Sequence, residues 1–307
     1  MNTLNINHRT ESADITRILT EEHGIGTFNN TAYQAFKRAN SDLVSPTRLK
    51  PYLTSPAAGL HADSEPQETT DAMRFGSLVH AYVLQPETIG TLFVSEEKRT
   101  ALKKDGTPYA DGRQDPAQKE EWEQKARQGI QVNSAAEHET AQLMAASVIA
   151  AIKAEMGEET YEAEQTMWWN NTTEQLTHIG QADLVSEHTD TIIDLKTIAD
   201  ANLKDSTLIN QCFTYGYQIQ AAAYDELYEI THGRHLRRFI FAFVSKTAPY
   251  HAKLLVLDEA QLQRCYGDYG TALLHYGKAR TAQDQKLPLS TVLPPCTRSL
   301  YYNPTEE

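Results

Sequence analysis

Cysteine is scarce in this sequence, which has only Cys212, Cys265 and Cys296 among its 307 residues. An odd number of widely spaced thiols does not indicate a disulfide framework. No C-x-x-C pair is present to build a zinc or iron–sulfur site. We therefore expect reduced thiols, as in a cytoplasmic protein, and no iron–sulfur cluster.

Long apolar runs are missing as well. No stretch approaches the ~18 consecutive apolar residues that a membrane span requires, and the N-terminus lacks the apolar segment of a signal peptide. The sequence also contains no G-x-x-x-x-G-K-[ST] motif, so nucleotide binding by a P-loop is excluded. We expect a protein without membrane contact that does not use ATP.

Basic residues are outnumbered by acidic ones, with 28 Lys and Arg against 41 Asp and Glu, and the formal net charge is −13. This balance excludes a uniformly basic surface that would coat nucleic acid, but it is compatible with a local basic channel. Apolar residues make up 40% of the chain and charged residues 22%, which is typical of a globular protein with a sizeable core.

The N-terminal half predicts mainly helices. Residues 1–42 are polar and irregular, and we expect at most a short helix there. Ser45 followed by Pro46 has the N-cap and N1 order that begins a helix. Residues 54–70 are rich in Pro, Ser, Asp and Glu and predict a loop, and a helix is expected from Thr70 to Leu84.

A charged loop and a long helical region follow. Residues 96–116 contain Gly, Pro and many charges and predict a mobile loop. The pattern from Ala117 to about Met156 is helical, with a break expected at Gly129.

From Tyr161 onward the hydrophobic period changes, and alternating segments predict strands. Strands are expected at Tyr161–Trp169, Leu176–Glu187, Thr189–Thr197, Leu236–Lys246 and Tyr250–Asp258, with helices at Asp205–Thr231 and about Glu259–Ala282. The order predicts an α/β fold with a mixed central sheet flanked by helices and a helical N-terminal region. We expect a polar segment at 1–42, one domain at 43–282 (a helical part at 43–156 and an α/β core at 157–282) and a Pro-rich tail at 283–307.

Two adjacent strands carry charged residues on one face. Asp194 and Lys196 are two positions apart in an apolar strand, so both side chains face the same side. A turn centred between His188 and Thr189 places Asp183 directly opposite Asp194. Directly opposed residues have Cβ atoms ~4.5–5.5 Å apart, where two carboxylates repel each other unless a proton or a cation lies between them. Oxygen ligands at that separation suit Mg²⁺ or Mn²⁺.

The same construction places other polar groups at this site. Gln181 falls opposite Lys196. If the loop 170–175 is centred at its middle, Glu164 falls opposite Gln181 and Glu162 opposite Asp183. We favour Glu164 as a third acidic group.

These groups predict phosphodiester hydrolysis. A divalent ion would polarise the scissile phosphate, and Lys196 would hold or activate the attacking water and stabilise the phosphorane oxygens. The alternative at this stage is an exposed hairpin in which Asp194 and Lys196 are simply solvated.

The order of these motifs resembles the PD-(D/E)XK nuclease superfamily, and more closely its RecE-like and RecB-like exonuclease branch. The resemblance covers about residues 43–245. The segments that carry it are Val44-Ser-Pro-Thr-Arg-Leu49, Arg74-Phe-Gly-Ser-Leu-Val-His80, Ala163-Glu164-Gln-Thr-Met-Trp-Trp169, Gly180-Gln-Ala-Asp183, Ile193-Asp194-Leu195-Lys196-Thr197 and Gln220-Ala-Ala-Ala-Tyr224. Two features depart from it: RecE is a much longer chain, and the four-cysteine cluster of iron–sulfur RecB-like nucleases is absent.

The resemblance implies a role for each matched residue. Asp183 and Asp194 would be metal ligands assisted by the Leu195 carbonyl, and Lys196 would be the catalytic lysine. The remaining implied site residues are His80 at the metal or phosphate, and Gln220 and Tyr224 lining the site from the following helix.

The resemblance also implies a function. A RecE-like enzyme resects linear duplex DNA from its 5′ ends in phage or bacterial recombination, as a ring-shaped homo-oligomer and often beside a RecT-like single-strand annealing protein. We expect Mg²⁺ as the cofactor, with Mn²⁺ as an alternative. The candidate DNA-binding residues are Lys103, Lys104, Arg234, Arg237 and Arg238. The open alternatives are a structure- or site-specific endonuclease on the same core, and a catalytically inactive scaffold that binds DNA or a partner.

Overall fold

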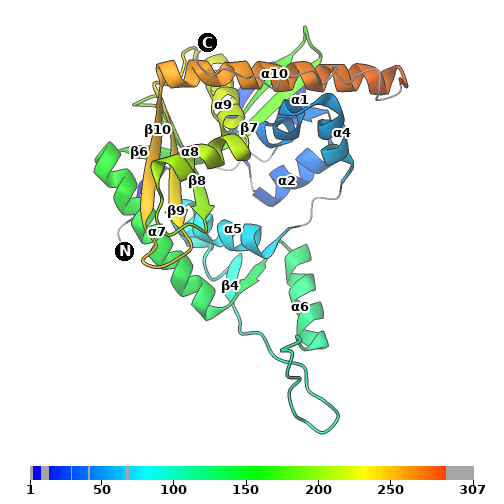
Figure 1. The fold of residues 1–307 in the computed structure, drawn as a ribbon, viewed down its shortest axis with the longest axis vertical. Helices are drawn as coiled ribbons and strands as arrows, with labels where there is room; N and C mark the ends of the chain where they lie inside the picture. The colour runs from blue at the N-terminus through cyan, green and yellow to red at the C-terminus, as the bar shows by residue number, and fades with distance from the viewer. Residues whose placement is uncertain (1–2, 8–13, 29, 41, 66–68, 288–307) are drawn as a thin grey trace, which may run out of the picture.

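A mixed sheet forms the centre of the molecule in a computed structural model that describes residues 3–7, 14–28, 30–40, 42–65 and 69–287 (Figure 1). Its strands follow the order β1-β6-β7-β8-β9-β10, while β2 also pairs with β6 and β3 with β7. The strands are β1 Asn5–Asn7, β2 His23–Thr27, β3 Leu43–Val44, β6 Thr160–Asn171, β7 Leu176–Ser186, β8 Thr191–Ile198, β9 Arg238–Ser245 and β10 Ala252–Asp258. The strands β4 Phe93–Ser95 and β5 Gln131–Asn133 form a separate small sheet.

Helices cover both faces of the central sheet. The α-helices are α1 Arg17–Thr20, α2 Asn30–Ala39, α3 Pro46–Leu49, α4 Pro56–Ser64, α5 Asp71–Leu84, α6 Pro116–Arg127, α7 Ala135–Met156, α8 Asp205–Thr214, α9 Tyr217–His232 and α10 Glu259–Asp284, and the 3-10 turns are η1 Lys50–Leu53 and η2 Pro86–Thr88. The predicted α/β class, with a mixed sheet flanked by helices, is confirmed. None of the helices in the described ranges is long and apolar enough to cross a membrane.

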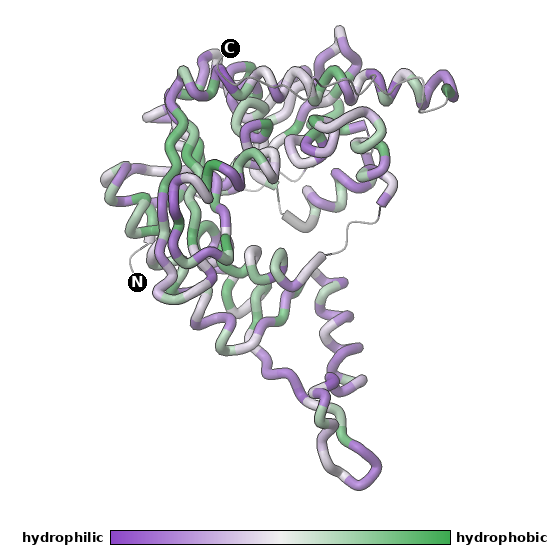
Figure 2. The backbone as a smooth tube through the Cα atoms, viewed as in Figure 1, coloured by the Kyte–Doolittle hydropathy of each residue, from purple (hydrophilic) through white to green (hydrophobic). Residues whose placement is uncertain are grey.

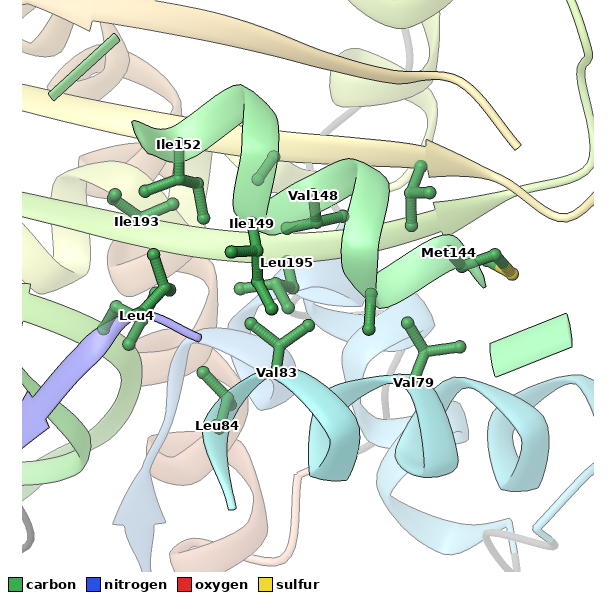
Figure 3. Packing of buried hydrophobic residues seen from close by; sticks show 14 of the residues in the cluster. Leu4, Val79, Val83, Leu84, Met144, Val148, Ile149, Ile152, Ile193 and Leu195 are labelled. Atoms are coloured by element: carbon green, nitrogen blue, oxygen red, sulfur yellow. The ribbon is translucent and has the colours of Figure 1, made fainter. Parts of the chain in front are cut away.

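One face of the sheet packs against α5 and α7. Ile193 and Leu195 of β8 point toward Val83 of α5 and Ile149 of α7 (Figure 3). α7 begins with a capping box, in which the Ser134 side chain accepts from the Glu137 backbone N–H and the Glu137 side chain accepts from that of Ser134. The cap and the buried apolar residues of α7 therefore hold this helix against the face of β8 that carries Ile193 and Leu195.

The opposite face packs against α8 and α9, and α10 lies outside α9. In β9, Phe239, Phe241 and Phe243 face α9, while the residues between them face α7. Hydrophobic residues concentrate on these central strands, whereas α6 and the loop before it are mostly hydrophilic (Figure 2). Both faces of β8 and β9 are thus buried, as expected for strands paired in parallel inside a layered fold.

The register predicted for β7 and β8 is confirmed. Leu184 pairs with Ile193 and Ser186 with Thr191, which corresponds to a turn centred between His188 and Thr189. The predicted pairs Asp183–Asp194 and Gln181–Lys196 lie beyond the last pair of this ladder and are not formed. The hairpin of β9 and β10, the Ser45 N-cap, the helix after Thr70 and the break at Gly129 are confirmed too. These features follow from local signals that the sequence carries at each position.

The prediction of an irregular N-terminal segment is wrong for its described residues. β1 pairs in parallel with β6, and β2 pairs antiparallel with β6 farther along the same strand. The segment 23–27 reads His-Gly-Ile-Gly-Thr and has too few large side chains to show an alternating pattern. Gly24 is needed because a Cβ atom there would lie 2.2 Å from Cζ2 of Trp168.

Two further expectations are corrected. The expected loop at 54–70 contains α4, which begins with Ser55 as N-cap and Pro56 at N1. The expected single helix Asp205–Thr231 is divided into α8 and α9, because Gly216 takes a left-handed conformation with φ 64°.

The outcome for the predicted loops differs from one segment to the other. The 96–116 segment is a loop that projects from the body before α6 (Figure 1), with bridges between Thr100 and Gln114 and between Leu102 and Pro108. In the predicted Pro-rich tail, α10 extends to Asp284, and residues 288–307 lie outside the described part.

We predict that Gly24→Ala destabilises the protein by roughly 1–3 kcal/mol, because the added methyl group overpacks against the buried Trp168 ring. Gly267→Ala in α10 is the matched control, since no described atom beyond its own turn of helix lies within 4 Å of a Cβ built there. The control should gain about 0.5–1 kcal/mol through helix propensity. Urea unfolding of both variants measures the difference, and equal stability would show that β2 does not pack on Trp168 as described.

Candidate active site

The candidate site lies where β7 and β8 separate. β7 pairs with β8 only from Leu184 to Ser186 and with β3 only at Thr177 and His178, so within the described strands 179–183 has no neighbour on that side. At the point of separation the Leu195 backbone N–H donates to Asp183 Oδ2 at 2.7 Å. A carboxylate therefore replaces the next ladder hydrogen bond, and the opening begins there.

Asp194 and Lys196 form an ion pair at this opening. Asp194 is 3% exposed, its Oδ2 contacts Lys196 Nζ, and its Oδ1 accepts from Gln220 Nε2 at 2.5 Å. Burial lowers the pKa of Lys196, but the nearby charges of Asp194 and Asp183 raise it, and the net pKa is above the ordinary value. Lys196 is therefore a charged ammonium group in this arrangement.

Asp183 completes the pair of carboxylates. Burial raises the pKa of Asp183, the charge of Asp194 raises it as well, and His80 and Lys196 act in the opposite direction. His80 Nδ1 lies 3.7 Å from Asp183 Oδ1. Ionising Asp183 therefore costs free energy, and a cation bound beside it would reduce that cost.

Helix α9 closes the site from the other side. Gln220 accepts a hydrogen bond from Lys196 Nζ at 3.2 Å, and Tyr224 OH donates to the Gln181 carbonyl on the unpaired edge of β7 at 2.5 Å. Gly180 leaves room for that ring, since a Cβ atom there would lie 2.4 Å from Tyr224 Cε1. The glycine in β7 and the tyrosine in α9 are thus a matched pair.

Glu164 reaches the site, but by a different register from the one predicted. β6 and β7 pair Glu162 with Val185 and Thr166 with Gln181, so the predictions that Glu162 lies opposite Asp183 and Glu164 opposite Gln181 are both wrong. The turn is tighter than expected because β6 extends to Asn171, two residues past its expected end, while β7 begins at Leu176 as expected. Glu164 stands outside the ladder with φ 48°, and its Oε2 accepts from Gln85 Nε2 at 2.6 Å.

Two pockets meet at these residues. The smaller, of about 240 Å³, is lined by Tyr33, Gln34, Lys37, Ser45, Pro46, Thr47, His80, Glu164, Gly180, Gln181, Asp183, Asp194, Lys196, Gln220 and Tyr224. The larger, of about 790 Å³, extends along α5 and also has Lys50, Leu195, Tyr217 and Lys246 in its wall. Both pockets contain His80, Glu164 and Lys196, so the structure brings the predicted catalytic residues to the junction of two open cavities.

Other pocket residues had no sequence signal. Lys37, Lys50 and Lys246 come from separate parts of the chain and reach the pockets only through the fold. No sequence motif marks any of the three lysines as a site residue. The helix start at Ser45 precedes Lys50 but does not indicate a role for its charge.

The predicted DNA-binding residues lie elsewhere. None of the five lines either pocket. Arg234 pairs with Asp190 at 2.5 Å and Arg238 with Glu155 at 3.3 Å, while Arg237 is exposed beside them. Lys103 and Lys104 are exposed on the projecting loop before α6. Any contact they make with DNA would lie outside these two cavities.

The residues at the junction fit a hard divalent cation. Among the described residues, no three His, Cys, Asp or Glu side chains are gathered into a preformed metal site. Two carboxylates at one opening, with the Leu195 backbone beside them, nevertheless supply the oxygen donors that such an ion takes, and the pockets leave space for water and substrate oxygens. Asp183 and Asp194 are the residues that would hold it.

Comparisons with known proteins agree with this arrangement. The model of a family described as a PDDEXK-like domain of unknown function (DUF3799) matches residues 45–286. A search of curated proteins found no match. Among solved structures, a candidate exonuclease from Eubacterium rectale aligns with a TM-score of 0.53 and 13% identity over 85% of this chain and 88% of its own. A phage-related exonuclease from Haemophilus somnus 129PT aligns with a TM-score of 0.35 and 11% identity over 78% of this chain and 96% of its own.

The matched region contains β6 to β10 of the central sheet, α9 and the residues that the two pockets share. The alignment with the Eubacterium rectale protein supports the fold, at an identity too low to carry more. PDDEXK nucleases generally use divalent metal ions. With an acid on β7 and Asp-x-Lys on β8, the chain belongs to this family of PDDEXK-like domains, within the PD-(D/E)XK nuclease superfamily.

Proposed function

We propose that the protein is a Mg²⁺-dependent exodeoxyribonuclease that hydrolyses phosphodiester bonds at the ends of duplex DNA. The observation that carries this proposal is that Asp183, Asp194 and Lys196 line one pocket, which meets a larger pocket at Lys196. Mn²⁺ has the same ligand preferences and is the alternative ion.

The chain's own residues divide the work. Asp183 and Asp194 would hold the ion, assisted by the Leu195 carbonyl. When bound, the ion supplies positive charge that stabilises the transition state and lowers the pKa of water. Lys196 carries a raised pKa, so it acts as a hydrogen-bond donor to a phosphate oxygen or to the attacking water rather than as a base.

Neighbouring side chains orient these groups. Gln220 contacts both Asp194 and Lys196 and thereby fixes the distance between the acid and the ammonium group. Tyr224 holds the unpaired edge of β7 through the Gln181 carbonyl. His80 lies next to Asp183, and Glu164 adds a third carboxylate to the lining of the same pocket.

The biological setting belongs to the same proposal. The resemblance to RecE-like enzymes, and the name of the Eubacterium rectale relative, favour digestion from DNA ends over internal cleavage. They support 5′-to-3′ resection in phage or bacterial recombination by a ring-shaped homo-oligomer, together with a RecT-like annealing protein. The intact set of Asp183, Asp194 and Lys196 speaks against an inactive scaffold.

We predict that the protein with Mg²⁺ degrades linear duplex DNA and leaves covalently closed circular DNA intact. Lys196→Ala should lower the rate by about 10²–10³-fold, the usual cost of removing one donor to the developing charge. Lys204→Ala is the matched control, because Lys204 is exposed at the start of α8 and lines neither pocket.

The result separates the alternatives. Cleavage of the circle that depends on Lys196 would identify an endonuclease on the same core. Equal digestion by wild type and Lys196→Ala, or no digestion by wild type with either Mg²⁺ or Mn²⁺, would refute the proposed site.

We predict that Asp183→Asn raises the melting temperature in EDTA at pH 7. Burial raises the pKa of Asp183, so its ionised form costs stability at every pH above that pKa, and the amide removes this cost. The Asn oxygen can still accept the Leu195 N–H.

The same variant tests metal binding. Mg²⁺ at about 100 times its dissociation constant should stabilise the wild type by ~2.7 kcal/mol and should leave Asp183→Asn almost unchanged. Asp284→Asn, on the exposed end of α10, should respond to Mg²⁺ as the wild type does. A full Mg²⁺ response in Asp183→Asn would exclude this carboxylate as a ligand.

A further inference from the structure

A second lysine lies beside the candidate catalytic lysine and matches none of the motifs of the superfamily. Lys50 is the first residue of η1, far from the catalytic strands in sequence, and it lines the larger pocket with Lys196. Its Nζ donates to Gln220 Oε1 at 3.3 Å, and Lys196 Nζ donates to the same oxygen at 3.2 Å. Two ammonium groups therefore share one neutral acceptor.

The two lysines also share an aromatic ring. Each Nζ lies 4.7 Å from the centre of the Tyr217 ring at the start of α9. Such cation–π contacts hold a cation without neutralising it. Lys50 is thus positioned by neutral groups alone, whereas Lys196 is also paired with Asp194.

Of the two lysines, only Lys196 has a carboxylate as an ion-pair partner in the described part of the chain. Asp194 pairs with Lys196, and no carboxylate of the described residues forms an ion pair with Lys50. Burial, and to a lesser extent the charge of Lys196, lower the pKa of Lys50 to about 8, although the charge of Asp194 opposes the shift. Placing an unbalanced cation beside another costs free energy, unless an anion joins the site.

The backbone at Gly216 leaves space for the side chain of Lys50. At Gly216, where α8 and α9 are divided, a Cβ atom would lie 3.1 Å from Lys50 Cγ and 3.3 Å from its Cβ. The left-handed glycine and the break in the helix thus leave the space that the lysine stem fills. Packing against Gly216 therefore fixes the position of the Lys50 side chain in the pocket.

We propose that Lys50 binds a non-bridging oxygen of a DNA backbone phosphate next to the scissile one, in the larger pocket. The inference rests on the proposed nuclease function. Lys196 serves the scissile phosphate, and Lys50, held by the same Gln220 oxygen, meets the adjoining phosphate of the same strand. The shared acceptor fixes the spacing of the two cations, so Lys50 positions the substrate strand relative to the reacting group.

The test measures DNA binding without hydrolysis. Fluorescence anisotropy of a labelled duplex in EDTA, over a range of KCl concentrations, compares wild type with Lys50→Gln, Lys50→Met and Lys50→Arg. Loss of one phosphate contact should make the slope of log K against log[KCl] shallower by about 0.9 and lower the affinity about 10-fold. Lys50→Arg keeps the charge and should keep the slope.

Two comparisons guard against indirect effects. Lys153→Gln removes the same charge outside both pockets, where Lys153 pairs with Glu158 at 3.6 Å, and it should bind DNA as the wild type does. Lys50→Met retains the aliphatic stem against Gly216, so a folded variant without the charge is available if Lys50→Gln loses stability. With Mg²⁺ present, KM should rise about 10-fold for the uncharged variants, and kcat should change much less.

The outcomes separate this inference from the proposed function. A wild-type slope in Lys50→Gln and Lys50→Met, or a loss of kcat with unchanged KM, would overturn the phosphate contact even if the enzyme digests DNA. A charge-dependent slope in a protein that does not hydrolyse DNA would uphold the contact and refute the nuclease. Wild type that does not bind DNA would overturn both.

Discussion

Charge balance at the opening between β7 and β8 is the constraint on which the rest of the site depends. Asp194 is buried and Asp183 nearly so, and an unbalanced buried charge costs several kcal/mol. Lys196 offsets one carboxylate, and Gln220 connects the acid to the ammonium group through its two amide ends. This connection requires α9 to start close to β8, which the turn at Gly216 allows. The helix break, the buried Gln220 amide and the separation of β7 from β8 therefore all contribute to accommodating the charges of Asp183, Asp194 and Lys196.

Strand geometry changes at the same place. Ala163 and Met167 of β6 have the same parity, yet the first packs with α7 and the second with α9. In β7, Ala182 and Leu184 likewise pack on opposite faces although they are two residues apart. Both strands thus rotate at Glu164 and Asp183, the one position where their ladder is interrupted. A regular strand would direct these two acids by simple alternation, whereas the local distortion aims them at the opening, as is common beside active sites.

The sequence was informative where the signals are local. The N-cap at Ser45, the helical pattern after Thr70, alternation in β7 and β8, and a tight turn between them predicted the elements and the pairing that places Asp183 near Asp194. It was uninformative where tertiary contacts decide. β1 and β2 are short strands at the edge of the sheet, recognisable only by their pairing with β6. Gly216, where the helix breaks, lies against the stem of Lys50, a residue more than 160 positions earlier in the chain, and no helix pattern contains the information that these two residues meet.

The acidic composition and the proposed substrate are compatible because of where the lysines are. Lys37, Lys50, Lys196 and Lys246 line the two pockets, while many surface cations are engaged with carboxylates, as Arg234 is with Asp190. A negative exterior repels the phosphate backbone at long range and opposes nonspecific coating of duplex DNA. Attraction is then confined to cavities that a DNA strand must enter. For an enzyme acting at ends this distribution favours productive binding, since an end can reach a recessed cation more easily than the middle of an intact duplex. The same distribution explains why total charge is a poor guide to this function: the number of cations that matter is small, and their depth matters more than their count.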